Sequence, residues 1–112
     1  MQTPAENRRF IEKRHHPRVA LPYNILLNQG LKSTDISDGG LGIQTSQNLK
    51  VGSFLQLNMD LSTEQLSVRA RVMRCSPSQS IFVDCNIVGV MFVDLPPSKL
   101  IRIRRFIEDL RK

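Results

Sequence analysis

Residues 55–72 read LQLNMDLSTEQLSVRARV, which is two alternating apolar segments joined by a polar connection. Apolar side chains occupy every second position, a period that is typical of β-strands with one buried face. The first segment carries Leu55, Leu57, Met59 and Leu61, and the second carries Leu66, Val68, Ala70 and Val72. We therefore expect two successive strands, separated by STEQ, that each present one apolar face.

Strand signals continue on both sides of this segment. Three earlier strands are expected over residues 18–28, 31–36 and 41–46, and a last one over residues 81–92. Pro22 weakens the first of them, because proline cannot donate to a strand ladder. Turn residues separate the strands at Gln29 and Gly30, at SDGG (37–40) and at SPSQS (76–80). In the last strand the apolar parity switches next to Gly89, which predicts a β-bulge or a bend.

The end of the chain changes to a helical period. After Pro96 and Pro97 we expect a helix over residues 98–111 with Ser98 as its N-cap. Its apolar stripe consists of Leu100, Ile103, Phe106, Ile107 and Leu110. Its other face carries Arg102, Arg105, Asp109 and Lys112, and Arg104 and Glu108 are spaced for an i,i+4 pair. Two interpretations remain open. Either the stripe is part of the core and covers one mouth of a barrel formed by the strands, or the helix binds a partner or responds to a ligand.

Six short strands in a chain of 112 residues predict an all-β fold, a six-stranded antiparallel β-barrel with a C-terminal α-helix. The chain has room for one compact domain. We divide it into a flexible basic N-terminal arm, residues 1–18, and a barrel with its helix, residues 19–112. No apolar run is long enough for a transmembrane helix, and the first residues lack the apolar core of a secretory signal, so we expect a cytoplasmic protein without membrane insertion.

The basic residues are concentrated at the two ends. The net charge is +6, and residues 1–18 hold five basic and two acidic side chains, residues 19–98 five and six, and residues 99–112 six and two. A basic end suits an anionic ligand, a nucleic acid or an acidic membrane surface, and charge alone does not select among them.

Patterns typical of enzymes and metal sites are missing from the sequence. The two histidines, His15 and His16, are adjacent and have no third ligand at metal spacing. There is no Gly-rich phosphate loop that opens a helix and no nucleophile elbow. Cys75 and Cys85 are too few for a disulfide scaffold, and we expect two free thiols in neighbouring strands. The sequence therefore predicts a protein that is not an enzyme and that holds neither a metal nor a cofactor.

Two short segments carry chemistry that suits a guanine nucleotide. Arg14 and Arg18 are two guanidiniums four residues apart, and the planar fork of arginine matches phosphate oxygens and the O6 and N7 acceptors of guanine. In the second segment, Asp35 can accept from the N1 and N2 hydrogens of guanine, and Ser37 adds a hydroxyl donor and acceptor. Gly40 lets the backbone turn sharply or approach a ligand closely. Together they predict that the arm holds phosphate while the turn recognises guanine.

At these residues the sequence resembles the PilZ domains, which bind the bacterial second messenger cyclic di-GMP. Arg14 and Arg18 match the family signature RxxxR, and Asp35, Ser37 and Gly40 match [D/N]xSxxG. The likeness extends over about residues 8–110 and includes VGVMF at residues 88–92. It implies a six-stranded barrel with a C-terminal helix, a ligand that lies on the outer surface of the barrel, and an arm that folds over that ligand.

Three further residues are candidates for the same ligand site. Arg9 and Lys13 lie just before the first signature, where neighbouring residues in the family set ligand stoichiometry, although a solvated basic arm is the competing interpretation. Gly39 lies inside the second signature.

The leading hypothesis is a bacterial receptor that binds cyclic di-GMP without altering it and signals to a protein effector in motility, exopolysaccharide or virulence machinery when its arm becomes ordered. The alternative is a nucleotide-independent adaptor whose helix binds a motility or export component. A third hypothesis, a barrel that binds single-stranded nucleic acid, is disfavoured by one Tyr, five Phe and no Trp.

Overall fold

Six antiparallel strands form one curled sheet in the order β1-β2-β3-β6-β5-β4, and one helix follows them. The computed structural model describes residues 17–78 and 84–112. The elements are β1 (Val19–Ala20), β2 (Lys32–Ile36), β3 (Gly40–Thr45), β4 (Phe54–Asp60), β5 (Gln65–Pro77), β6 (Asn86–Val93) and α1 (Pro97–Leu110). The prediction of an all-β, six-stranded antiparallel fold with a C-terminal helix is confirmed.

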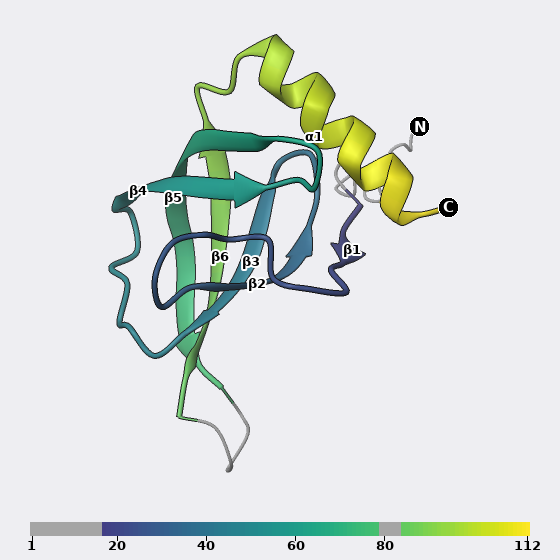
Figure 1. Ribbon diagram of the computed structural model, residues 1–112. Coiled ribbons are helices and arrows are strands. Elements are labelled where there is room, and N and C mark those ends of the chain that lie inside the picture. The colour runs from purple at the N-terminus through teal and green to yellow at the C-terminus, as the bar shows by residue number, and fades with distance from the viewer. Residues whose placement is uncertain (1–16, 79–83) are drawn as a thin grey trace, which may run out of the picture.

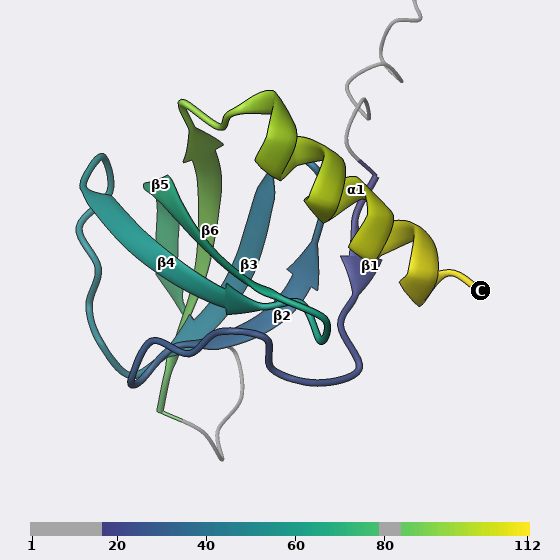
Figure 2. The ribbon, with the colours of Figure 1, turned by 45° about the horizontal axis from the view of Figure 1, so that its top comes forward.

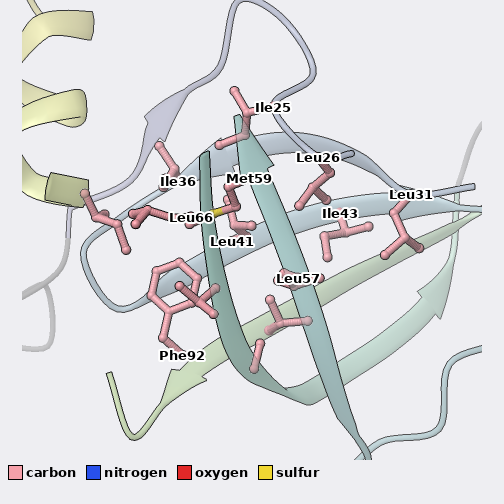
Figure 3. Packing of buried hydrophobic residues seen from close by; sticks show 14 of the residues in the cluster. Ile25, Leu26, Leu31, Ile36, Leu41, Ile43, Leu57, Met59, Leu66 and Phe92 are labelled. Atoms are coloured by element: carbon pink, nitrogen blue, oxygen red, sulfur yellow. The ribbon is translucent and has the colours of Figure 1, made fainter. Parts of the chain in front are cut away.

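The alternation in residues 55–72 produces the β4–β5 pair and the centre of the core. The two strands are antiparallel, with Leu57 opposite Val68 and Leu55 opposite Ala70. Figure 3 shows side chains from several strands converging on the inner face of the sheet, among them Leu57, Met59 and Phe92. Since directly opposed residues in such a pair point to the same face, the apolar positions of both strands are buried together.

The predicted strand over residues 18–28 is wrong beyond its first residues. β1 contains only Val19 and Ala20, and the chain then leaves β2. Pro22 has no N–H to donate, and the side chain of Asn24 takes over local bonding: its Oδ1 accepts from the backbone N–H of Leu26 at 3.0 Å and of Ser33 at 2.8 Å. These bonds turn the chain away from the first strand.

The connection from β1 to β2 then runs along the opposite edge of the sheet, next to β4 (Figure 1, Figure 2). The N–H of Leu27 donates to the carbonyl of Asn58, and the N–H of Asp60 donates to the carbonyl of Ile25, each at 2.8 Å. An edge strand with unpaired backbone groups is therefore partly covered, and the curled sheet approaches a closed barrel.

β5 is longer than predicted and carries the irregularity that the sequence placed near Gly89. It continues to Pro77, so SPSQS is strand at its first two residues, and residues 79–83 lie outside the described part. The pairing register shifts between Val72 and Arg74, and Arg74 is opposite Gly89 in β6. The extra residue, Met73, therefore belongs to β5, across from the predicted position.

α1 lies across one end of the curled sheet (Figure 2) and covers the core there. Ile103, Phe106 and Ile107 are buried in the same cluster as the strands, which confirms that the apolar stripe is core. The predicted N-cap at Ser98 is wrong: the helix begins one residue earlier, with Pro96 as cap and no side-chain cap bond. Proline at the first helical position supplies the required φ, so the helix begins without a capping side chain.

Candidate functional site

The structure describes five of the eight predicted site residues. Arg9, Lys13 and Arg14 lie outside the described residues, as do His15 and His16. Arg18, Asp35, Ser37, Gly39 and Gly40 lie at the start of β1, in β2 and in the turn that leads into β3. The part of the site that the structure describes is therefore built at one corner of the sheet.

Arg18 and Asp35 are joined by a direct ion pair. In the ladder between β1 and β2, Ala20 is opposite Asp35. Arg18 comes two residues before Ala20, and this pairing brings it next to the carboxylate of Asp35. The Nη1 atom of Arg18 lies 3.0 Å from Oδ1 of Asp35, and 44% and 32% of the two side chains stay exposed. One arginine of the first signature and the carboxylate of the second thus face the same solvent-accessible position.

Asp35 is held over a glycine of the neighbouring strand. Gly42 is its partner in the ladder between β2 and β3, and a Cβ atom at Gly42 would overlap Oδ1 of Asp35. The missing side chain leaves the space in which the carboxylate lies. The place of Gly42 beneath Asp35 depends on the pairing of β2 with β3, which a local sequence pattern does not specify.

The turn at residues 37–40 is held by its own polar groups. The N–H of Ser37 donates to the carbonyl of Gly40 at 2.9 Å, and the hydroxyl of Ser37 accepts from the N–H of Gly39 at 3.2 Å. A hydroxyl that accepts one bond keeps its own hydrogen to donate. A Cβ at Gly40 would overlap the carbonyl oxygen of Val90 in β6. In this structure Gly40 lets two strands approach closely, which is a structural role.

A hollow of about 220 Å³ brings four of the predicted residues together. It is lined by Arg18, Ser37, Gly39 and Gly40 from the β1 side, and by Met73, Arg74, Gly89, Val90 and Met91 from β5 and β6. The sequence reasoning missed the second group. The parity switch at Gly89 was the one available signal, since a bulge often redirects a side chain.

Arg74 reaches this hollow because of the bulge and the glycine opposite. A Cβ at Gly89 would lie 3.0 Å from Nε and 3.2 Å from Cγ of Arg74, so the arginine stem crosses the glycine closely. The site therefore has a second described arginine, on the wall of the hollow that faces Arg18 and the turn. Two guanidiniums at one hollow favour an anionic, planar ligand.

The turn is also joined to the helix. Nε of Arg104 lies 3.1 Å from Oδ2 of Asp38, in place of the i,i+4 pair with Glu108 that the spacing suggested. A second hollow, of about 200 Å³, is lined by Pro17, Asp38, Arg104, Ile107, Glu108 and Arg111. Pro17, Asp38 and α1 therefore meet at one junction, and Asp38 lies between Ser37 and Gly39, which line the first hollow.

Other features of the described residues do not compete with this hollow as a site for the predicted chemistry. A hollow of about 260 Å³ between α1 and the β4–β5 turn is lined by none of the predicted site residues. Within residues 17–78 and 84–112, no three His, Cys, Asp or Glu side chains are grouped to hold a metal ion. Cys75 and Cys85 are free thiols, each half-buried. In these same ranges no helix is long and apolar enough to cross a membrane.

Comparison with known families agrees with the geometry. The model of the PilZ domain matches residues 12–109, which includes both signatures. The chain belongs to the PilZ domain family. No curated protein matches the sequence.

Two solved structures share this PilZ fold. One is described as the PilZ domain with c-di-GMP of YcgR from Escherichia coli; it has a TM-score of 0.74 and 17% identity, over 88% of this chain and 92% of that one. The other is YcgR in complex with c-di-GMP from Escherichia coli, with a TM-score of 0.72 and 17% identity over 88% of this chain. This chain spans 46% of that second protein. At this identity the likeness establishes the fold.

Proposed function

We propose that this chain is a cytoplasmic bacterial receptor that binds cyclic di-GMP without altering it. The site consists of Arg14, Arg18, Asp35, Ser37 and Gly40, with Arg9, Lys13 and Gly39 as additional contacts. The observation that carries the proposal is the hollow in which Arg18 meets the turn of the second signature. Family membership and the two YcgR structures, whose descriptions name c-di-GMP, support the choice of ligand.

The residues have distinct roles in this proposal. The guanidinium forks of Arg14 and Arg18 bind phosphate oxygens or the O6 and N7 edge of guanine. Asp35 accepts from N1 and N2 of guanine, a pairing that adenine does not offer. Ser37 donates its hydroxyl hydrogen while its oxygen stabilises the turn. Gly40 acts indirectly, by keeping β3 close to β6.

The signal in this proposal is the ordering of the arm, residues 1–18, over the bound nucleotide. Fixing backbone costs roughly 1–2 kcal/mol per residue, so the arginine and guanine contacts must exceed that cost. The product is a new surface made of arm and ligand, which a protein effector recognises. Pro17 and α1 line the same hollow, so in this proposal a change in the arm also alters the surroundings of the helix.

Isothermal titration calorimetry with cyclic di-GMP tests the proposal directly. Binding heat is expected for the intact chain and a large loss of affinity for Arg14→Ala, Arg18→Ala and Asp35→Ala. Arg102→Ala removes a partly exposed positive charge that lines a different hollow and is the matched control, with unchanged affinity expected. Absence of heat with the intact chain, or undiminished binding in all three site variants, rejects the receptor assignment.

A further inference from the structure

Large apolar side chains remain exposed in a row across the outer face of three strands. Phe54 of β4, Met73 of β5 and Met91 of β6 are 51%, 48% and 42% exposed. Phe54 is opposite Arg71 in the β4–β5 ladder, and Arg71 is opposite Met91 in the β5–β6 ladder. Since directly opposed residues share a face of the sheet, these side chains form one continuous surface. We call Phe54, Arg69, Arg71, Met73 and Met91 the β5 strip.

Two arginines of the strip pack on its aromatic ring. The Cζ atom of Arg69 lies 4.3 Å from the centroid of the Phe54 ring, and that of Arg71 lies 5.9 Å away. Both distances are within the range of a cation–π contact. The arginine stems and the ring therefore support each other in an extended position on an open sheet face, so less side-chain freedom remains to be lost when a partner binds.

The positive charge of this surface is not neutralised within the described protein. In residues 17–78 and 84–112 the ion pairs join carboxylates to Arg18, Arg102, Arg104 and Lys112, and none joins one to an arginine of β5. Three of the five basic residues between positions 19 and 98 lie on β5, at positions 69, 71 and 74. A near-neutral barrel thus concentrates its cations on one strand.

The residue types indicate a protein partner. The centres of protein interfaces are enriched in Arg, Met and aromatic residues and depleted in Lys, and the β5 strip contains Arg, Met and Phe with no Lys. Arginine binds carboxylates through two parallel hydrogen bonds, which favours Asp and Glu as its counterparts. Surfaces that bind anionic membranes are instead typically Lys/Arg-rich amphipathic helices, unlike this flat strand surface.

From these observations we propose that the β5 strip docks a segment of a partner protein in which Asp or Glu residues flank an apolar side chain. The apolar side chain packs against Phe54 and Met91, and the carboxylates bind Arg69 and Arg71. Met73 and Met91 also line the hollow assigned to cyclic di-GMP, so a ligand there adjoins the docked segment. Docking of the segment does not require the nucleotide. Only an effect of bound nucleotide on this docking would rest on the proposed function.

The test uses a display library of random peptides panned against the whole chain. Selected peptides are expected to combine Asp or Glu with aromatic or aliphatic residues, and their synthetic forms are measured by fluorescence anisotropy. The double variant Arg69→Glu/Arg71→Glu is expected to weaken binding about tenfold or more, because it places like charges opposite the peptide carboxylates. Phe54→Ser is expected to weaken the binding of the same peptides.

The control changes the same charge elsewhere on the barrel. Lys32→Glu/Lys112→Glu reverses two exposed basic residues, one on β2 and one after α1, outside the three strands that carry the strip, and binding is expected to stay within about twofold, since charges on these elements are largely screened from the strip at physiological salt. Peptides whose Asp and Glu are replaced by Lys are expected to bind the Arg69→Glu/Arg71→Glu variant better than the parent chain. If that variant does not fold by circular dichroism, Arg69→Gln/Arg71→Gln replaces it.

Several outcomes overturn the proposal. They are selected peptides without acidic and apolar residues, an equal loss in both double variants, and binding of phosphatidylglycerol vesicles or poly(U) RNA that depends on Arg69 and Arg71 when no peptide does. Calorimetry with cyclic di-GMP on the same variants separates the two proposals. A chain that binds peptides at the strip but gives no heat with the nucleotide rejects the receptor function and leaves the docking surface intact.

Discussion

The guanidinium of Arg18 donates to the carboxylate of Asp35 at 3.0 Å, so a direct ion pair joins the two signatures of this PilZ domain. In the proposed complex, a guanine that pairs with Asp35 and a phosphate that pairs with Arg18 would each replace part of this contact. Because both side chains are partly exposed, the pair contributes only about 0.2–1 kcal/mol to stability, so the ligand can displace it at small cost.

Because the Arg18–Asp35 ion pair is weak, we expect separate effects of its removal on stability and on binding. Arg18→Ala is expected to lower the free energy of unfolding of the ligand-free chain by less than about 1 kcal/mol, measured by urea denaturation, while it removes most of the affinity for cyclic di-GMP. Arg102→Ala, which breaks a comparable exposed pair with Glu64, is the control for stability and should leave binding unchanged. A loss of several kcal/mol in Arg18→Ala would mean that the pair holds β1 in place.

Two glycines of β3 are expected to fail in different ways. Gly40→Ala brings a Cβ into the backbone carbonyl of Val90, which cannot move without shifting β6, so a loss of about 1–3 kcal/mol in unfolding free energy is expected. Gly42→Ala meets the side chains of Asp35 and Thr34 instead, and these can rotate. Its main effect should be weaker nucleotide binding, with a smaller change in stability.

The measurements are urea denaturation and calorimetry on both variants. The two substitutions add the same methyl group two positions apart on one strand, so each controls for the other. Equal destabilisation by both, with binding lost in proportion, would show that Gly42 has no specific role in positioning Asp35 and that the strand simply tolerates no side chain at either position.

A further prediction concerns Arg74, which lies on the wall of the hollow that β5 forms. Arg74 lines the hollow, whereas Arg71, on the same strand, does not. Arg74→Ala is expected to weaken cyclic di-GMP binding about tenfold, because a hydrogen bond to a charged group contributes about 1.5–3 kcal/mol. Arg71→Ala removes an equal charge from the same strand and should have little effect. Similar losses in both, diminished equally by added salt, would assign only long-range attraction to Arg74.

Local sequence patterns predicted those elements whose structure does not depend on distant parts of the chain. The alternation of residues 55–72 is enough to define β4 and the first part of β5, because each strand needs only one buried face. The segment over residues 18–28 has a similar alternation, yet Tyr23 and Leu27 are exposed and Leu26 is buried. Its path depends on Asn24 and on the distant edge of β4, and neither contact is visible in a local pattern.

The candidate site, too, could be predicted only where it depends on local sequence. Arg18, Ser37, Gly39 and Gly40 share one hollow, as the order of the two signatures suggested. Met73 and Arg74 were missed because their direction depends on a register shift between β5 and β6, and register is a property of two strands together. The first arginine of the pair, Arg14, lies outside the described residues, and its role stays a prediction.

The helix provides a last comparison, between two isoleucines on opposite faces. Ile103 is fully buried in the core, and Ile101 is 51% exposed. Ile103→Ala is expected to lower the free energy of unfolding by about 2–5 kcal/mol, because it removes buried methylenes and leaves a cavity. Ile101→Ala should change it by less than about 0.5 kcal/mol, as surface substitutions usually do. Urea denaturation measures both. If the Ile103 variant kept its stability, α1 would not be an integral part of the core, and an independently moving helix would have to be considered as the element that transmits the signal.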